Sequence, residues 1–239
     1  MDAIQVRGLE RTFGSVRALD GLDLDVAEGE LLGLIGPNGA GKTTLIRTLA
    51  GLLAPSGGTV RVLGKAPGRA VASEVGYMTQ AAALYDDLTV EENLSFFGRI
   101  YGLSPRDARA RAAVLADLVE LKDKLHTPAR DLSGGMRQLV NLTCAMVHDP
   151  ALLLLDEPTV GIDPLLRRAL WAYFASLNAA GTTILITTHV MDEADRCARI
   201  ALIADGRTLA TGSPQALRAT TASGSLEDAF LHLRDRAPA

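Results

Sequence analysis

Residues 36–44 read GPNGAGKTT and match the phosphate-binding pattern G-x-x-x-x-G-K-S/T. Glycines let the backbone approach phosphate groups, because no Cβ stands in the way. Lys42 would reach the β- and γ-phosphates of a nucleotide, and the Thr43 hydroxyl would hold Mg²⁺. We expect Lys42 to be exposed and to pair only with phosphate; the alternative is a glycine-rich turn that matches by chance. The predicted nucleotide-binding residues of this loop are Gly36, Pro37, Asn38, Gly39, Ala40, Gly41, Lys42, Thr43 and Thr44.

The segments that flank this loop favour a nucleotide-binding role for it over a chance match. The apolar residues 31–35 are typical of a buried strand, and residues 43–53 are predicted to form a helix. The loop therefore leads into a helix N-terminus, where free backbone N–H groups and the helix dipole favour an anion.

Two adjacent acids, Asp156 and Glu157, follow the four leucines 152–155. The leucines predict a parallel strand that is buried on both faces. Asp156 suits a Mg²⁺ ligand, directly or through water, and Glu157 could orient or deprotonate an attacking water. We expect their side chains to point to opposite sides of an extended strand end. Adjacent acids are more often a solvated loop, but this position in a chain with a phosphate loop favours a functional role.

Two further polar residues follow predicted strands: Gln80 follows residues 75–78, and His189 follows residues 183–187. Ligands of an open parallel sheet lie outside the carboxyl ends of its strands, so both side chains should face the phosphate loop. His189 could donate a hydrogen bond to a γ-phosphate, or it could cap the next helix.

The chain begins with two predicted strands, residues 4–13 and 19–26. The second alternates apolar residues with aspartates, which predicts one buried and one wet face. Phe13 lies at the turn between them and could either stack on a flat base or belong to the core.

Residues 133–135 read Ser-Gly-Gly before a predicted helix, 136–147, and make a second candidate anion site. One chain needs only one such site. Two complementary phosphate sites suggest head-to-tail dimers with the nucleotide between the chains.

The order of predicted elements gives an α/β fold: a mostly parallel P-loop NTPase core, an N-terminal antiparallel β subdomain and an inserted helical subdomain at about 86–148. The α/β pattern resumes at residue 151, and Asp205-Gly206 predicts a hairpin turn. We predict a domain over 1–219, followed at 220–239 by a linker and a short helical tail.

Bulk composition excludes several classes of protein. The formal net charge of −4 over 239 residues argues against a nucleic-acid partner. The sequence contains no apolar run near the roughly 20 residues that a spanning helix needs, and we expect no signal peptide. The two cysteines, Cys144 and Cys197, are expected to be buried, reduced thiols in predicted helices.

Together these motifs resemble the nucleotide-binding subunit of an ATP-binding-cassette (ABC) transporter, over nearly the whole chain. Residues 36–44 match its Walker A motif, 152–156 its Walker B motif and 132–136 its signature. Further matches are the catalytic glutamate (Glu157), the glutamine loop (Gln80), the D-loop (161–163), the switch histidine (His189) and the adenine-stacking aromatic (Phe13).

This resemblance implies a Mg²⁺-dependent ATPase with Glu157, His189 and Gln80 in catalytic roles. Thr43, Gln80 and Asp156 would hold Mg²⁺. It also implies a homodimer or pseudo-dimer that sandwiches two ATP molecules, with Ser133, Gly134, Gly135 and Asp163 among the nucleotide-binding residues. One departure is Met136, which stands where the signature usually has Gln and cannot donate a hydrogen bond to the nucleotide.

Residues 83–90, 159–164 and 225–231 resemble the type-2 exporter branch of the family, which moves drugs, lipids or polysaccharides. The resemblance then implies a separate membrane-spanning permease, with this chain cytoplasmic and peripheral on the inner face of the membrane. Five of the ten aromatic residues are concentrated near Gln80, and we predict that some of them line a groove for the permease: Tyr77, Tyr85, Phe96, Phe97 and Tyr101.

Two alternatives remain open. One is a soluble ABC-type ATPase that acts on nucleic acid or the ribosome; the short helical insertion, the single cassette and the net charge count against it. The other is a nucleotide-dependent regulator that does not hydrolyse, and the presence of both Glu157 and His189 counts against it.

Overall fold

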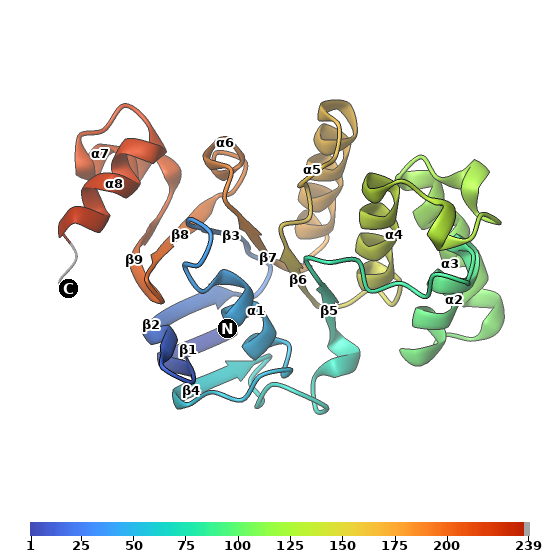
Figure 1. Cartoon of the computed structure of the whole chain (residues 1–239), viewed down its shortest axis with the longest axis horizontal. Helices are drawn as coiled ribbons and strands as arrows, with labels where there is room; N and C mark the ends of the chain where they lie inside the picture. The colour runs from blue at the N-terminus through green and yellow to red at the C-terminus, as the bar shows by residue number, and fades with distance from the viewer. Residues whose placement is uncertain (237–239) are drawn as a thin grey trace.

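Two β-sheets share the α/β core of the computed structural model, which describes residues 1–236 (Figure 1). The smaller sheet is antiparallel, has the order β2-β1-β4 and confirms the predicted N-terminal β subdomain. Its strands are β1 (Asp2–Phe13), β2 (Val16–Ala27) and β4 (Gly57–Val62). β4 begins at Gly57, although its two leading glycines are residues typical of a turn.

The larger sheet has six strands in the order β5-β6-β7-β3-β8-β9. Its first five strands are parallel, and β9 pairs antiparallel with β8 through the predicted Asp205-Gly206 hairpin. The strands are β3 (Leu31–Ile35), β5 (Val75–Met78), β6 (Leu152–Asp156), β7 (Thr183–Thr188), β8 (Arg199–Ala204) and β9 (Arg207–Gly212). The register sets Asp156 beside Thr187 and Ile35 beside Thr188, so three strands end at one edge.

The two faces of this sheet are buried against different partners. Leu152 and Leu154 of β6 join a cluster with the antiparallel sheet and α1 (Lys42–Leu49). Leu153 and Leu155 join the cluster on the other face, with helices α4 (Gly134–Met146) and α5 (Pro164–Ala179). All of β6 is buried, as its run of leucines predicts.

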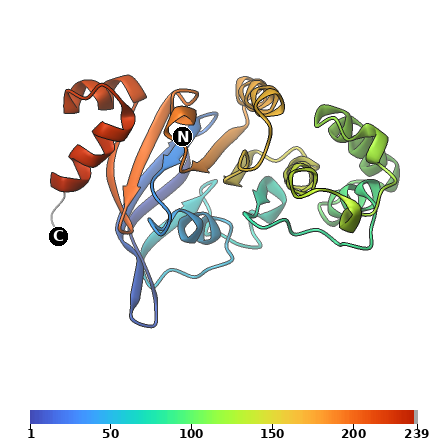
Figure 2. The same cartoon turned by 45° about the horizontal axis from the view of Figure 1, so that its top comes forward.

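The inserted helices α2 (Val90–Ile100), α3 (Pro105–Leu118) and α4 form one end of the molecule, drawn in greens at the right of Figure 1 and again set to one side in Figure 2. Thr89 and Glu92 form a capping box at the start of α2, with both hydrogen bonds present. Ser104 and Ser133 cap α3 and α4 through their side chains.

The C-terminal helices α7 (Pro214–Thr221) and α8 (Leu226–Arg236) lie at the opposite end, beyond β9 (Figure 1). Leu226 and Phe230 of α8 are buried in the same cluster as α4 and α5, so the predicted tail packs on the core. The predicted linker begins inside α7, which ends at Thr221. Residues 237–239 lie outside the described part of the chain.

Helix lengths differ from prediction at α1, which ends at Leu49 because Gly51 follows with φ 75°. The short α6 (Met191–Ala194) ends before Cys197. Both cysteines are free and buried, as expected, and burial raises the pKa of the Cys197 thiol to about 12. Within residues 1–236, no helix combines the length and apolar character needed to cross a membrane.

Candidate functional site

A cavity of about 350 Å³ opens over the loop that joins β3 to α1, a size within the usual range of small-molecule sites. Predicted residues from four separate regions meet there: Phe13 at the end of β1, and residues that follow β3, β5 and β6, which all end at this edge. The lining residues are Phe13, Ala18, Asn38, Gly39, Gly41, Lys42, Thr43, Thr44, Gln80 and Glu157.

Gly36 and Ala40, which do not line the cavity, are the buried residues of the loop. A Cβ on Gly36 would lie 2.1 Å from the carbonyl oxygen of Ile203 in β8. Any larger residue would therefore push the loop away from the sheet. The sequence pattern requires glycine here because of this close approach.

Lys42 differs from its prediction, because it is buried, with 5% of its surface exposed. Its Nζ donates hydrogen bonds to the carbonyl oxygens of Gly36 (2.6 Å) and Pro37 (3.0 Å) and lies 3.8 Å from Oε1 of Glu157. Burial lowers the pKa of Lys42, and Glu157 and Asp156 oppose that shift. The Lys42 amine therefore points back toward its own loop. The local sequence alone does not show this orientation.

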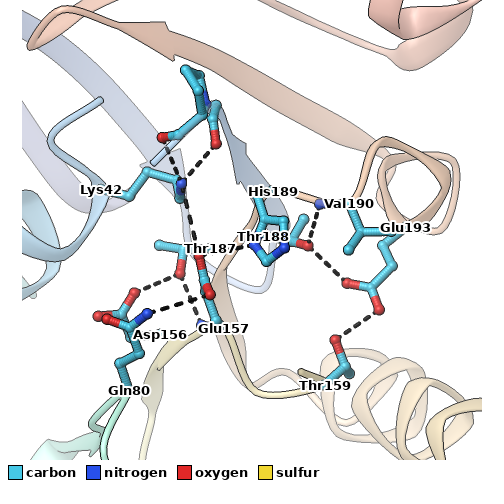
Figure 3. Close-up of polar contacts among 12 residues, drawn as sticks. Lys42, Gln80, Asp156, Glu157, Thr159, Thr187, Thr188, His189, Val190 and Glu193 are labelled. Carbon is cyan, nitrogen blue, oxygen red and sulfur yellow. Dashed lines mark hydrogen bonds and ion pairs between the residues drawn. The ribbon is translucent and has the colours of Figure 1, made fainter. Parts of the chain in front are cut away.

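Glu157 is the point at which the predicted catalytic residues meet (Figure 3). Its Oε1 lies 3.1 Å from Nδ1 of His189, and its Oε2 accepts a hydrogen bond from Nε2 of Gln80 at 3.4 Å. The carboxylate is 7% exposed, yet it borders the nucleotide-sized cavity. A buried carboxylate beside one amine, one imidazole and one amide can accept a proton from a bound water.

The backbone at Glu157 corrects the expectation of an extended strand end. Its φ is 54°, in the left-handed region that non-glycine residues rarely adopt. The strand therefore turns at Glu157 and does not continue to alternate sides. Such conformations cost roughly 1–3 kcal/mol and are common at active sites.

Asp156 is fully buried, and only one of its oxygens is occupied by the protein. Oδ1 accepts a hydrogen bond from Oγ1 of Thr187 at 2.7 Å, whereas Oδ2 has no hydrogen-bond partner among residues 1–236. A buried, unpaired carboxylate oxygen fits a Mg²⁺ ligand, either directly or through water. Within residues 1–236, no three acidic, cysteine or histidine side chains are grouped so that they could hold a metal ion.

Thr187 was not singled out from the sequence. Its hydroxyl bonds Asp156 and also accepts the backbone N–H of Glu157 at 2.9 Å, so it fixes both acids. The signal that could have found it is the register of parallel strands, which brings the end of β7 beside the end of β6.

Phe13 lies at the end of β1 with 44% of its surface exposed, and it lines the cavity, which fits a base-stacking role. The guanidinium of Arg11 lies 4.6 Å from the centre of the Phe13 ring and donates a hydrogen bond to the carbonyl of Ala54 at 2.7 Å. Arg11 was also missed, although it lies two residues before Phe13 in the same strand.

The second predicted anion site is not part of this cavity. Ser133 and Gly135 line a separate hollow of about 330 Å³ together with Asp163, whose carboxylate caps α5 through the amides of Leu165 and Leu166. A smaller cavity of about 190 Å³ is lined by residues of both regions: Gln80, Gly134, Gly135, Gln138, Glu157, Val160 and Gly161.

Comparisons with known proteins agree with this arrangement. A family model described as ABC transporter matches residues 19–160. Nod factor export ATP-binding protein I of Paraburkholderia xenovorans (strain LB400) is 44% identical over 222 residues, which cover 91% of this chain and 73% of that protein.

Two further comparisons differ in how much of the relative they cover. The probable multidrug ABC transporter ATP-binding protein YbhF of Escherichia coli (strain K12) is 39% identical over 96% of this chain, which spans only 41% of YbhF. A solved ATP-binding subunit of an ABC transporter superposes with a TM-score of 0.89 at 30% identity, covering 97% of this chain and 99% of that one. Sequence, fold and the phosphate loop thus agree, and the chain belongs to the ABC transporter family as an ATP-binding cassette.

Proposed function

We propose that this chain hydrolyses Mg²⁺-ATP and thereby powers export through a separate membrane-spanning permease. The observation that carries the proposal is the position of Glu157, whose carboxylate lies within 4 Å of Lys42, Gln80 and His189 at the border of the phosphate-loop cavity.

Each residue has a role that its surroundings support. The phosphate-loop amides and Lys42 bind the phosphates, and the ring of Phe13 stacks on the base. Thr43, Asp156 and Gln80 hold Mg²⁺, which supplies charge stabilisation to the transferring phosphoryl group. Glu157 accepts a proton from the attacking water, and His189 orients Glu157 and contacts the γ-phosphate.

Two copies of the chain are needed to complete each site. Ser133 and Gly135 belong to a hollow that the phosphate loop does not reach, so in a single chain they are positioned for a second nucleotide. A head-to-tail homodimer would set the signature residues Ser133, Gly134 and Gly135, together with Asp163, against the phosphates bound by the other copy.

The permease is proposed to dock on α2. A groove of about 560 Å³ there is lined by Leu88, Glu92, Ser95, Phe96, Arg99 and Ile100. Phe96 packs edge-on against Tyr85, with ring centres 4.7 Å apart, and Tyr85 is 50% exposed. Of the five predicted aromatic residues, Phe96 lines this groove, whereas Tyr77 and Phe97 pack against the core clusters and Tyr101 stacks on His148.

Docking on the permease would place the chain on the cytoplasmic, inner face of the membrane, and export is the proposed direction of transport. The relatives named above are an export and a probable multidrug ATP-binding protein, which supports the same direction of transport here. The cassette is taken as residues 1–219, with 220–239 as its linker and tail.

The test replaces Glu157 by Gln, which keeps the size of the side chain and removes the proton acceptor. Phosphate release should fall by about 10²-fold or more, while ATP binding by equilibrium dialysis stays near normal. Glu227→Gln, an exposed exchange on α8, is the matched control and should behave as wild type. Brisk hydrolysis by Glu157→Gln, or a wild-type protein that releases no phosphate, would overturn the proposal.

A further inference from the structure

A buried carboxylate outside the nucleotide-sized cavity is hydrogen-bonded to a near neighbour in sequence of each member of the proposed catalytic pair, Glu157 and His189. Glu193 of α6 is 3% exposed and does not line the phosphate-loop cavity. Its Oε2 accepts a hydrogen bond from Oγ1 of Thr188 at 2.9 Å, and its Oε1 accepts one from Oγ1 of Thr159 at 2.7 Å. Figure 3 shows these two bonds beside the Glu157–His189 contact.

The threonine on one side immediately precedes His189. The Thr188 hydroxyl donates to Glu193 and accepts the backbone N–H of Val190 at 3.0 Å, so one hydroxyl ties the peptide unit after His189 to the residue before it. The Thr188 hydroxyl therefore helps to fix the backbone position from which the imidazole of His189 extends.

The threonine on the other side follows Glu157 by two residues. The Glu157 amide is already bonded to Thr187 before the left-handed turn, and Thr159 anchors the chain after it. Both threonines are nearly fully buried, with 3% of their surface exposed. Glu193 therefore spans the gap between the strand ends that carry Glu157 and His189.

The same carboxylate also reaches the loop that includes Asp163. Nε of Arg167 lies 4.0 Å from Oε1 of Glu193, and Nη2 of Arg167 donates to the carbonyl of Ile162 at 3.0 Å. A buried carboxylate is costly unless it is paired, and here two hydroxyls donate hydrogen bonds to it while the Arg167 guanidinium lies nearby as a counter-charge.

We propose that Glu193 is a positioning residue for ATP hydrolysis. It holds Glu157 and His189 at their working separation through Thr159 and Thr188, and through Arg167 it links that separation to the conformation of the 161–163 loop. This inference rests on the proposed hydrolytic function, since it assigns a role to a residue that supports the same reaction. A purely structural carboxylate would affect stability alone.

The experiment compares Glu193→Ala with Glu193→Gln. The alanine variant loses both bonds, so kcat for ATP should fall by roughly 10-fold or more while KM and the affinity for ATP stay within about twofold. Gln can accept from one threonine and donate to the other, so Glu193→Gln should restore kcat to within about threefold of wild type. Asp192→Asn, on the same short helix, is the matched control.

Two further measurements separate positioning from stability. In a crystal structure of Glu193→Ala the separation of His189 Nδ1 and Glu157 Oε1 should widen beyond the 3.1 Å seen here. If Glu193→Ala does not fold, Thr159→Val and Thr188→Val each remove one hydroxyl in a nearly isosteric side chain, and each should lower kcat without raising KM.

The outcomes distinguish the two proposals. A wild-type protein that hydrolyses ATP, with normal kcat in Glu193→Ala or in both valine variants, overturns the role of Glu193 and leaves the ATPase intact. A thermal midpoint that falls while kcat, measured well below it, stays unchanged has the same meaning. A wild-type protein that releases no phosphate defeats the proposed function itself.

Discussion

Met136 departs from the signature of the family, and the structure indicates how much this should matter. Its thioether is half-buried and packs against the core cluster that includes α4, while its amide donates to the Ser133 hydroxyl at 3.3 Å. The side chain therefore packs on the core and lines the same hollow as Ser133 and Gly135, which are the proposed phosphate donors.

Replacing Met136 by Gln should accordingly change ATPase activity by less than about tenfold, which is roughly 1.4 kcal/mol in the barrier. The reason is that position 136 does not supply a proposed phosphate contact, so it should tune the rate. Steady-state phosphate release, with Ser133→Arg as the reference for a disabled signature, measures this. A loss as large as that of Ser133→Arg would show that position 136 is essential.

Residue identities in this site could be predicted from the sequence, but their conformations could not. Local sequence is enough to recognise the spaced glycines of the phosphate loop, the two acids after four leucines and the polar residues at the ends of strands. The burial of Lys42 depends on the hydrogen bonds from its amine to the carbonyls of Gly36 and Pro37. The turn at Glu157 depends on the hydrogen bond from the Glu157 amide to Thr187, which belongs to another strand. Both are set by tertiary contacts, which periodicity does not encode.

At the scale of elements, the α2 groove makes a specific prediction. Phe96→Ala removes one wall of the groove and the edge-on contact with Tyr85. We expect ATPase activity of the purified chain to stay within about twofold, while substrate transport in vesicles that hold the permease falls at least tenfold.

Val114 supplies the control for that experiment, because it is also apolar and exposed but lies on α3, away from the groove. Val114→Ala should leave transport unchanged. Equal transport by Phe96→Ala and wild type would mean that the permease docks elsewhere.

The turn before β3 carries an ion pair whose effect should depend on pH. Glu30 accepts hydrogen bonds from Arg199 of β8 at 2.5 and 2.9 Å and from the Ala27 amide at 2.8 Å. Burial alone would raise the pKa of Glu30, but these bonds more than offset it and hold the pKa below its ordinary value. The stabilisation of the fold by this ion pair is therefore present above the pKa that Glu30 has in the unfolded chain. It is lost as pH falls through the pKa that Glu30 has in the folded protein.

Glu30→Gln should lower the thermal midpoint by about 2–4 °C at pH 7, corresponding to roughly 1 kcal/mol for a partly exposed pair. The difference from wild type should shrink as pH falls through the folded pKa of Glu30, which lies below its ordinary value, because Glu30 itself then becomes neutral. Calorimetry across this range tests the expectation, with the exposed neighbour Glu28→Gln as control. A difference that stays constant with pH would assign the effect to packing.

Most strands could be predicted from the hydrophobic pattern of the sequence, but the start of β4 could not. Gly57 and Gly58 are residues typical of a turn, yet both lie in β4, where Gly57 pairs with Glu10 of β1 and Gly58 falls at an irregularity in register. A Cβ on Gly58 would lie 2.2 Å from the carbonyl oxygen of Gly8, so glycine here permits two backbones to approach. Only the partner strand distinguishes that use of glycine from a turn.

At the scale of the whole molecule, the separation of the two anion sites predicts a nucleotide-dependent dimer. Glu157→Gln should run as a dimer in size-exclusion chromatography with Mg²⁺-ATP and as a monomer with ADP. The physical reason is that the γ-phosphate supplies the contacts proposed for Ser133 and Gly135 of the opposite copy.

Ser133→Arg in the same background is the control and should remain monomeric with either nucleotide, because the bulky cation blocks the contact. An inactive Glu157→Gln protein that stays monomeric with ATP would contradict a sandwich formed by the cassette alone. It would leave the assignment of the base unaffected.

The bonds that Lys42 makes to its own loop have a consequence for ligand selectivity. Any anion that uses Lys42 must compete with the carbonyls of Gly36 and Pro37, and charge-assisted bonds of this kind are worth roughly 1.5–3 kcal/mol each. A triphosphate replaces these two hydrogen bonds with several contacts to the loop at once. A single free phosphate replaces them with few contacts, so its net gain in binding free energy is small. The loop thus discriminates by the number of phosphates a ligand brings, and the reaction product phosphate should be a poor competitor of the incoming nucleotide.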